Sequence, residues 1–302
     1  MASSYWDSTQ RRNWTYTKPE LADIRKKLED SERVLVSQYP LPDRRLLSQY
    51  FAQQLQKLGK PLSVRQQALA TAQIYIRRFY TKVEIRRTNP LLVVATALYL
   101  ACKMEECPQH IRLLSAEANH NWPDFGPKEP SRIGECEFAL IAEMNSQLII
   151  HHPYRSMTEL QSSFPLSQEE NNLAWNIIND HYLTDLPLLH APHLIAITAM
   201  VLAVVLRPQQ STHQVHAANV ANALQALSNP KAAPGANGPG GANIQIRIQK
   251  LITWLAESSA DIEAIVDCTQ ELISLYEVWD QYNEKVCREQ INRFVKGKGL
   301  EK

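Results

Sequence analysis

The stretch Asn89-Pro-Leu-Leu-Val-Val-Ala-Thr-Ala-Leu-Tyr-Leu-Ala-Cys102 decides the fold of this 302-residue chain. Asn89 has a capping side chain and Pro90 suits the first helical position, so the pair predicts the start of a helix. From Leu91 to Cys102 the residues are apolar on every side, which predicts a helix that is buried all round. Strand patterns are scarce elsewhere, and helical spacing of apolar residues is frequent. We therefore expect an all-α fold in which amphipathic helices wrap this one.

The same pattern recurs 102 residues further along the chain. Pro90 is matched by Pro192, and the helix before each proline matches as well, with Ile76 on Ile178. Further pairs at this offset are Leu92 with Leu194, Val93 with Ile195, Thr96 with Thr198, Leu100 with Leu202 and Tyr80 with Tyr182. Two units of about a hundred residues, each built round a buried helix that starts at proline, predict a duplicated all-α domain.

The order of these patterns predicts the domain organisation. We expect an N-terminal segment with one helix over 1–40, a first unit over 41–150, a linker over 151–157, a second unit over 158–284 and a polar tail over 285–302. Residues 229–241 consist mainly of Gly, Pro, Ala and Asn, which cannot bury enough apolar surface to offset their ordering entropy. The second unit is therefore expected to carry a flexible insertion over 207–243.

Composition and motifs exclude several functional classes. The chain has 32 Lys and Arg against 31 Asp and Glu, so its net charge of +1 gives no overall attraction to nucleic acid or to anionic membranes. The longest apolar run, Leu194 to Leu206, is shorter than the roughly 20 residues that a membrane span needs. The five cysteines form no C-x-x-C pair, and no nucleophile elbow or phosphate-binding loop is present. We expect no catalytic residue, no cofactor and no metal.

Two charged residues stand in apolar surroundings. Lys103 ends the all-apolar helix, and Glu137 lies inside an apolar stripe with Ile133, Leu140 and Ile141. A carboxylate at such a position is costly to bury unless it is paired or presented to a partner. Two interpretations stay open, an internal Lys103–Glu137 ion pair and a pair of polar anchors at a protein interface. The periodicity favours the internal pair, and both can hold together.

Three motifs in the first unit resemble the cyclin family: Tyr75-Ile-Arg-Arg-Phe79, Leu100-Ala-Cys-Lys-Met-Glu-Glu106 and Glu135-Cys-Glu-Phe138. Shorter matches, among them Tyr5-Trp6 and His152-Pro-Tyr-Arg155, are similar to the cyclin C branch, the cyclins of the Mediator kinase module. The matches span most of residues 1–284. The resemblance implies an all-α fold of tandem cyclin-box repeats, two five-helix bundles, with an additional N-terminal helix.

The resemblance also implies a function. It indicates a non-catalytic regulatory subunit in the nucleus that activates the Mediator-associated cyclin-dependent kinase, whose targets are the C-terminal repeats of RNA polymerase II and transcription factors. Other Mediator kinase-module subunits are implied partners, and direct nucleic-acid binding and membranes are not. The implied kinase contacts are Lys103 and Glu137, with Met104, Ile141 and Leu148 as apolar contacts around them. Tyr5 and Trp6 are candidates for a partner-specific contact.

The sequence departs from the cell-cycle cyclins at their docking groove for substrate motifs. Leu47-Ser-Gln-Tyr-Phe51 and Gln54 occupy the groove positions, and Arg77 stands where those cyclins have Asp. We therefore do not predict that groove. The alternative function is that of a general transcription factor with tandem cyclin folds that clamps promoter DNA. It is disfavoured because such a protein would carry a zinc ribbon and a basic face.

Overall fold

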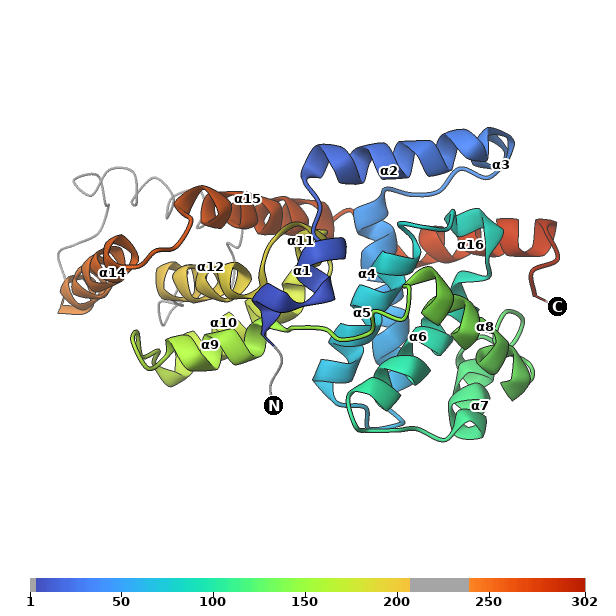
Figure 1. The fold of residues 1–302 in the computed structure, drawn as a ribbon, viewed down its shortest axis with the longest axis horizontal. Helices are drawn as coiled ribbons and strands as arrows, with labels where there is room; N and C mark the ends of the chain where they lie inside the picture. The colour runs from blue at the N-terminus through green and yellow to red at the C-terminus, as the bar shows by residue number, and fades with distance from the viewer. Residues whose placement is uncertain (1–3, 207–238, 302) are drawn as a thin grey trace. The chain divides into compact units, whose positions relative to one another are not determined.

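The computed structural model describes residues 4–206 and 239–301 of the chain. These residues form helices connected by turns and loops, without a strand among them, so the all-α prediction is confirmed for the described part. The chain divides into two compact units, Met1–His151 together with Tyr282–Lys302, and His152–Gln281. Figure 1 shows the helices of both units. None of the helices in the described ranges combines the length and the apolar composition that crossing a membrane requires.

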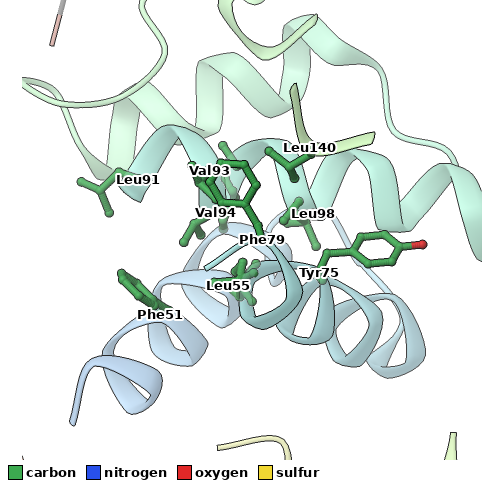
Figure 2. Close-up of a cluster of buried hydrophobic side chains, with 14 of the residues drawn as sticks. Phe51, Leu55, Tyr75, Phe79, Leu91, Val93, Val94, Leu98 and Leu140 are labelled. Atoms are coloured by element: carbon green, nitrogen blue, oxygen red, sulfur yellow. The ribbon is translucent and has the colours of Figure 1, made fainter. Parts of the chain in front are cut away.

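The first unit is a bundle around one central helix, α6. Its helices and short 3-10 turns (η) are η1 (Tyr5–Asp7), α1 (Thr9–Asn13), α2 (Lys18–Ser31), α3 (Arg33–Gln38), α4 (Arg44–Gly59), α5 (Gln66–Phe79), η2 (Ile85–Arg87), α6 (Pro90–Met104), α7 (Ile111–Asn121), α8 (Pro130–Glu143) and α16 (Glu284–Gly297). Helices α4, α5, α7 and α8 pack around α6. Figure 2 shows part of the resulting core, in which side chains of α4, α5, α6 and α8 meet.

Helix α6 starts and is buried as its sequence predicts. The Asn89 side chain accepts hydrogen bonds from the backbone N–H groups of Leu91 and Leu92, at 3.1 and 3.4 Å. Its amide also donates to the carbonyl of Phe125 at 2.8 Å, which ties the start of α6 to the loop before α8. Eleven of the fifteen residues of α6 are buried, so the helix lies inside the bundle on nearly all sides.

The second unit repeats this design. Its helices are α9 (Pro153–Leu160), α10 (Gln168–His181), α11 (Leu186–Leu189), α12 (Pro192–Val205), α14 (Pro239–Glu257) and α15 (Ile262–Trp279). Helices α10 and α12 begin 102 residues after α5 and α6, at Gln168 and Pro192. Helix α12 is the buried one, and α9, α10, α14 and α15 pack against it. The predicted duplication is therefore present in the structure.

The N-terminal segment holds more structure than the single helix that the sequence predicts. The predicted charged helix corresponds to α2, which starts with a reciprocal capping box between Thr17 and Glu20. The elements η1 and α1 precede it and α3 follows it.

The structure corrects the predicted boundaries of the linker and of the insertion. The expected linker 151–157 is helical from Pro153 onward, because proline after an extended residue is a favoured first helical position. The predicted insertion 207–243 lies outside the described residues up to 238, and its last five residues already belong to α14.

The predicted polar tail over 285–302 is wrong, because these residues contain most of α16. Four of its residues recur on one helical face and are buried in the core of the first unit: Cys287, Ile291, Phe294 and Val295. The remaining face is strongly charged, so the average composition hides the apolar stripe. The last helix of the chain thus belongs to the first unit, and the second unit ends at Gln281 instead of 284.

Candidate protein-interaction surface

The two charged residues that the sequence analysis singled out form an ion pair. Lys103 in the last turn of α6 donates from Nζ to Oε1 of Glu137 on α8 at 2.6 Å. The Glu137 side chain is 13% exposed and that of Lys103 is 43% exposed. The ammonium also lies 5.0 Å from the centroid of the Tyr99 ring, within reach of a cation–π interaction. The internal pairing interpretation is therefore confirmed in this structure.

This ion pair contributes little to the stability of the fold, so a partner protein could replace it with bonds of its own. Because the Lys103 side chain is 43% exposed, water screens the pair, which contributes at most about 1 kcal/mol to stability. A cation at the carboxyl end of α6 is also favoured by the helix dipole, whether or not it keeps its carboxylate. Exchanging the Lys103–Glu137 bond for bonds to another protein would therefore cost little. The two interpretations of the pair are compatible.

Apolar side chains border the pair on both helices. Met104 next to Lys103 is 39% exposed, and Phe138 next to Glu137 is 77% exposed. Ile141, one turn beyond Phe138 on α8, is half-buried against the core. We call these five residues, Lys103, Met104, Glu137, Phe138 and Ile141, the α6–α8 surface. An exposed phenylalanine and methionine beside polar groups are typical of a protein-binding site.

Phe138 is the residue of this surface that sequence reasoning missed. It lies in the motif Glu135-Cys-Glu-Phe138 but off the apolar stripe of α8 that singles out Glu137. The sequence does contain a signal for it, because a large aromatic residue on the solvent side of an amphipathic helix is unexpected.

The end of α6 is fixed by bonds to α5. The carboxylate of Glu105 accepts from Thr71 Oγ1 at 2.5 Å and from Gln67 Nε2 at 2.6 Å. Glu106 then adopts a positive φ of 52°, and the Cys107 N–H returns to the Cys102 carbonyl at 2.9 Å. This is the left-handed termination of a helix, and it holds the backbone that carries Lys103 and Met104.

Leu148 follows the end of α8 in an extended stretch, residues 147–151. It is half-buried against the core of the first unit, and its carbonyl accepts a hydrogen bond from the Tyr75 hydroxyl at 2.6 Å. The next residue, Ile149, is 56% exposed. Directly after α8, the stretch thus places two apolar side chains next to each other in the sequence, Leu148 half-buried and Ile149 exposed.

Tyr5 and Trp6 form η1 at the start of the described chain. The Tyr5 ring packs edge-on against His151 at 5.8 Å between centroids. Trp6 is 54% exposed and is covered on one face by Arg11, whose guanidinium carbon lies 5.2 Å from the ring centroid. Trp6 is therefore accessible to a partner, whereas Tyr5 packs within its own unit.

The positions of the cell-cycle docking groove are covered by α16, which packs on α4. Tyr50 is 1% exposed, and Gln54 accepts from the Trp122 indole at 2.9 Å. Glu284 forms an ion pair with Lys57, and the Tyr282 hydroxyl donates to Gln53 Oε1 at 2.7 Å. The chain's own last helix therefore occupies this face of the first unit.

The departure at Arg77 has a local counterpart on α4. Arg77 Nη1 donates to the Ser48 hydroxyl at 2.9 Å, which adds a polar link between α4 and α5.

The described residues contain no group of three or more His, Cys, Asp or Glu that could hold a metal ion. None of the five cysteines forms a disulfide in the described residues, and burial raises the pKa of the Cys102 thiol to about 12, so that thiol stays protonated near neutral pH. The α6–α8 surface instead offers polar and apolar groups suited to binding a protein.

Comparisons with known proteins agree with this description. Residues 25–149 match the family model described as cyclin, N-terminal domain. The chain is 59% identical to the RNA polymerase II holoenzyme cyclin-like subunit of Aspergillus oryzae and 53% identical to that of Neurospora crassa, with all of both chains covered in each case.

Two solved structures show the same fold at low identity. One is a chain of the CAK complex from Chaetomium thermophilum bound to ATP-gamma-S, with a TM-score of 0.61 at 22% identity, covering 100% of this chain and 91% of that one. The other belongs to the yeast TFIIK (Kin28/Ccl1/Tfb3) complex, with a TM-score of 0.57 at 18% identity, covering 89% of this chain and 100% of that one.

Proposed function

The chain belongs to the cyclin family, in the group of RNA polymerase II holoenzyme cyclin-like subunits, and on that premise we propose that it binds and activates the cyclin-dependent kinase of the Mediator kinase module. The observation that carries the proposal is the α6–α8 surface, where a weakly held ion pair is bordered by the exposed side chains of Met104 and Phe138. The surface contains the motif residues that the family resemblance assigns to kinase binding.

The mechanism is a shift between two states of the kinase. An isolated kinase of this class mostly holds its αC helix displaced, which separates the αC glutamate from the lysine that orients ATP. A cyclin that binds the αC-in state more tightly shifts the population toward it. A change from 1:99 to 99:1 requires about 5.5 kcal/mol of differential affinity. A few well-packed contacts at the centre of an interface can supply this amount.

The polar and the apolar residues at the proposed interface have different roles. The Lys103 ammonium and the Glu137 carboxylate bond to backbone or polar groups beside the kinase αC helix. Met104, Phe138, Ile141 and Leu148 bury apolar area around these bonds and exclude water, which strengthens them. The chain supplies no reacting group, and its contribution is the binding energy that selects the active kinase.

The wider role follows from the same premise. We propose that the active kinase phosphorylates the C-terminal repeats of RNA polymerase II and transcription factors, that the complex acts in the nucleus, and that other Mediator kinase-module subunits bind it there. The high identity to holoenzyme subunits over the full chain supports this placement.

A pull-down and a kinase assay with the purified Mediator kinase test the proposal. Lys103→Glu and Glu137→Lys are each expected to lose kinase binding and activation at least ten-fold, and circular dichroism and melting of each variant check that it is folded. The matched control is Lys250→Glu on α14, which reverses an exposed charge in the second unit and should bind like the wild type. Folded variants that activate the kinase normally would show that the α6–α8 surface is not the kinase site.

A further inference from the structure

The extended stretch 147–151 is held in place by residues distant in the sequence. It begins after a turn in which Asn145 and Ser146 both have positive φ, at 51° and 57°. The Ser146 N–H returns to the Ile141 carbonyl at 2.9 Å, which ends α8. Two consecutive non-glycine residues in the left-handed region are unfavourable by themselves, so the surrounding contacts must stabilise them.

Two side chains of α5 hold the backbone of the stretch by hydrogen bonds. The Tyr75 hydroxyl donates to the Leu148 carbonyl at 2.6 Å, and Arg78 Nη1 donates to the Gln147 carbonyl at 2.8 Å. Arg78 is only 1% exposed, and burial lowers the pKa of its guanidinium to about 10. A buried cation needs compensation, and the backbone carbonyl of Gln147 supplies part of it.

A second set of hydrogen bonds comes from the N-terminal segment. The Gln10 side-chain amide pairs with the backbone of His151 in both directions, accepting from its N–H at 2.7 Å and donating to its carbonyl at 3.4 Å. The Trp14 indole N–H donates to Gln147 Oε1 at 2.7 Å. Gln10 and Trp14 are 4% and 1% exposed, so these three bonds are largely shielded from water.

Trp14 also compensates the buried cation. The Arg78 guanidinium carbon lies 4.8 Å from the centroid of the Trp14 ring, a cation–π geometry. Trp14 therefore contacts the stretch twice, directly through Gln147 and indirectly through Arg78. The N-terminal segment thus holds the stretch at its first and last residues, Gln147 and His151, and α5 holds it at its first two.

We propose that residues 5–14 act as a clip that positions the stretch 147–151 for kinase binding, with Gln10 and Trp14 as positioning residues. The clip leaves Ile149 exposed and fixes the backbone of Leu148, one of the residues assigned to the kinase contact. Fixing an extended segment before binding removes the entropy cost of ordering it in the complex. This inference rests on the proposed kinase-binding function. Gln10 and Trp14 act through the backbone that they hold.

The test combines Gln10→Ala with Trp14→Phe in the full chain. Phenylalanine keeps an aromatic ring beside Arg78 but removes the N–H that bonds Gln147, so the fold is expected to persist. Hydrogen–deuterium exchange at residues 147–151 should become about ten-fold faster in the cyclin alone. The Kd for the purified Mediator kinase should rise about ten-fold. If the double variant does not fold, Gln10→Ala alone is used. It should likewise exchange faster at residues 147–151 and have a higher Kd for the kinase.

Arg12→Ala is the matched control. Arg12 lies in the same segment, is exposed and donates to the nearby Asp7 carbonyl, so its loss should change neither readout. Unchanged exchange in the double variant would show that the clip does not hold the stretch. Faster exchange with unchanged kinase affinity would show that the stretch needs no positioning. A wild type that fails to bind the kinase would instead overturn the proposed function, and the exchange data would still decide whether the clip exists.

Discussion

Trp14 is a single residue that connects three parts of the first unit. It bonds Gln147, covers the buried guanidinium of Arg78 and is itself fully buried. Trp14→Ala should therefore cost more than the usual 3–5 kcal/mol for a buried aromatic residue, because it also uncovers a buried charge. Trp14→Phe should cost less than half as much. Urea unfolding of both variants measures the difference, and equal losses would show that the ring does not stabilise Arg78.

Asp180 in the second unit gives a prediction for pH. Burial raises the pKa of its carboxyl to about 6, although the Tyr276 hydroxyl donates to Oδ2 at 2.9 Å and opposes the shift. The unfolded chain releases this proton near pH 4, so the folded state binds more protons between pH 4 and 6. The contribution of Asp180 to stability therefore falls as pH rises through this window. Above it, the buried carboxylate costs roughly 2–3 kcal/mol.

Asp180→Asn removes this titration and keeps an acceptor for the Tyr276 hydroxyl. We expect the variant to be more stable than the wild type at pH 7.5 by roughly 2–3 kcal/mol, with the difference vanishing near pH 4. Chemical unfolding across this pH range measures the free energy of both proteins. Parallel pH profiles for the two proteins would contradict the prediction.

Sequence reasoning at the residue scale found the ion pair but not all of its surroundings. Lys103 and Glu137 were identifiable because a charge in an apolar pattern requires an explanation. The anchors of the 147–151 stretch were not, because Gln10 and His151 lie 141 residues apart and their pairing depends on tertiary contacts. Periodicity describes one helix at a time and gives no information about such contacts.

Helices were predictable where one pattern dominates the whole element. The all-apolar α6 and α12 were found at their prolines, because a helix apolar on every side has only one favourable environment. Helix α16 was missed because its four buried residues are spread among charged ones over fourteen positions. A segment of mostly polar composition can therefore still form a helix with one buried face.

Helix α16 should be part of the stable core of the first unit. A chain that ends at Gln281 would expose the surface of α4 and lose four buried residues, Cys287, Ile291, Phe294 and Val295. At roughly 1.5–3 kcal/mol for each large apolar side chain, the loss is expected to exceed about 5 kcal/mol. Hydrogen exchange should show faster opening in α4 and α6, with α10 and α12 much less affected. A truncated chain whose first unit stays as protected as in the wild type would contradict this account.

For the whole molecule, the duplication in the sequence is the feature that predicts the architecture. Two matching units 102 residues apart predict two similar bundles, and the structure contains them. The membership of α16 in the first unit was not predictable from the repeat, since nothing in the second unit corresponds to it in sequence order.

The near-neutral charge of the whole chain also gives a prediction. With 32 basic and 31 acidic residues, we expect no tight binding to duplex DNA and no steep dependence of binding on salt. Fluorescence anisotropy with a labelled promoter duplex at 50 and 200 mM salt measures this. Binding that weakens by orders of magnitude between these conditions would favour the promoter-clamping alternative.

The most direct test of the account is the affinity of the purified Mediator kinase for the doubly reversed variant Lys103→Glu with Glu137→Lys. This variant can remake the internal ion pair in reverse, so its melting temperature should stay close to that of the wild type. The account predicts that calorimetric titration shows nanomolar to micromolar binding for the wild type and at least a ten-fold loss for the variant. Equal affinity of the two proteins for the kinase would contradict the central claim that this pair anchors the kinase.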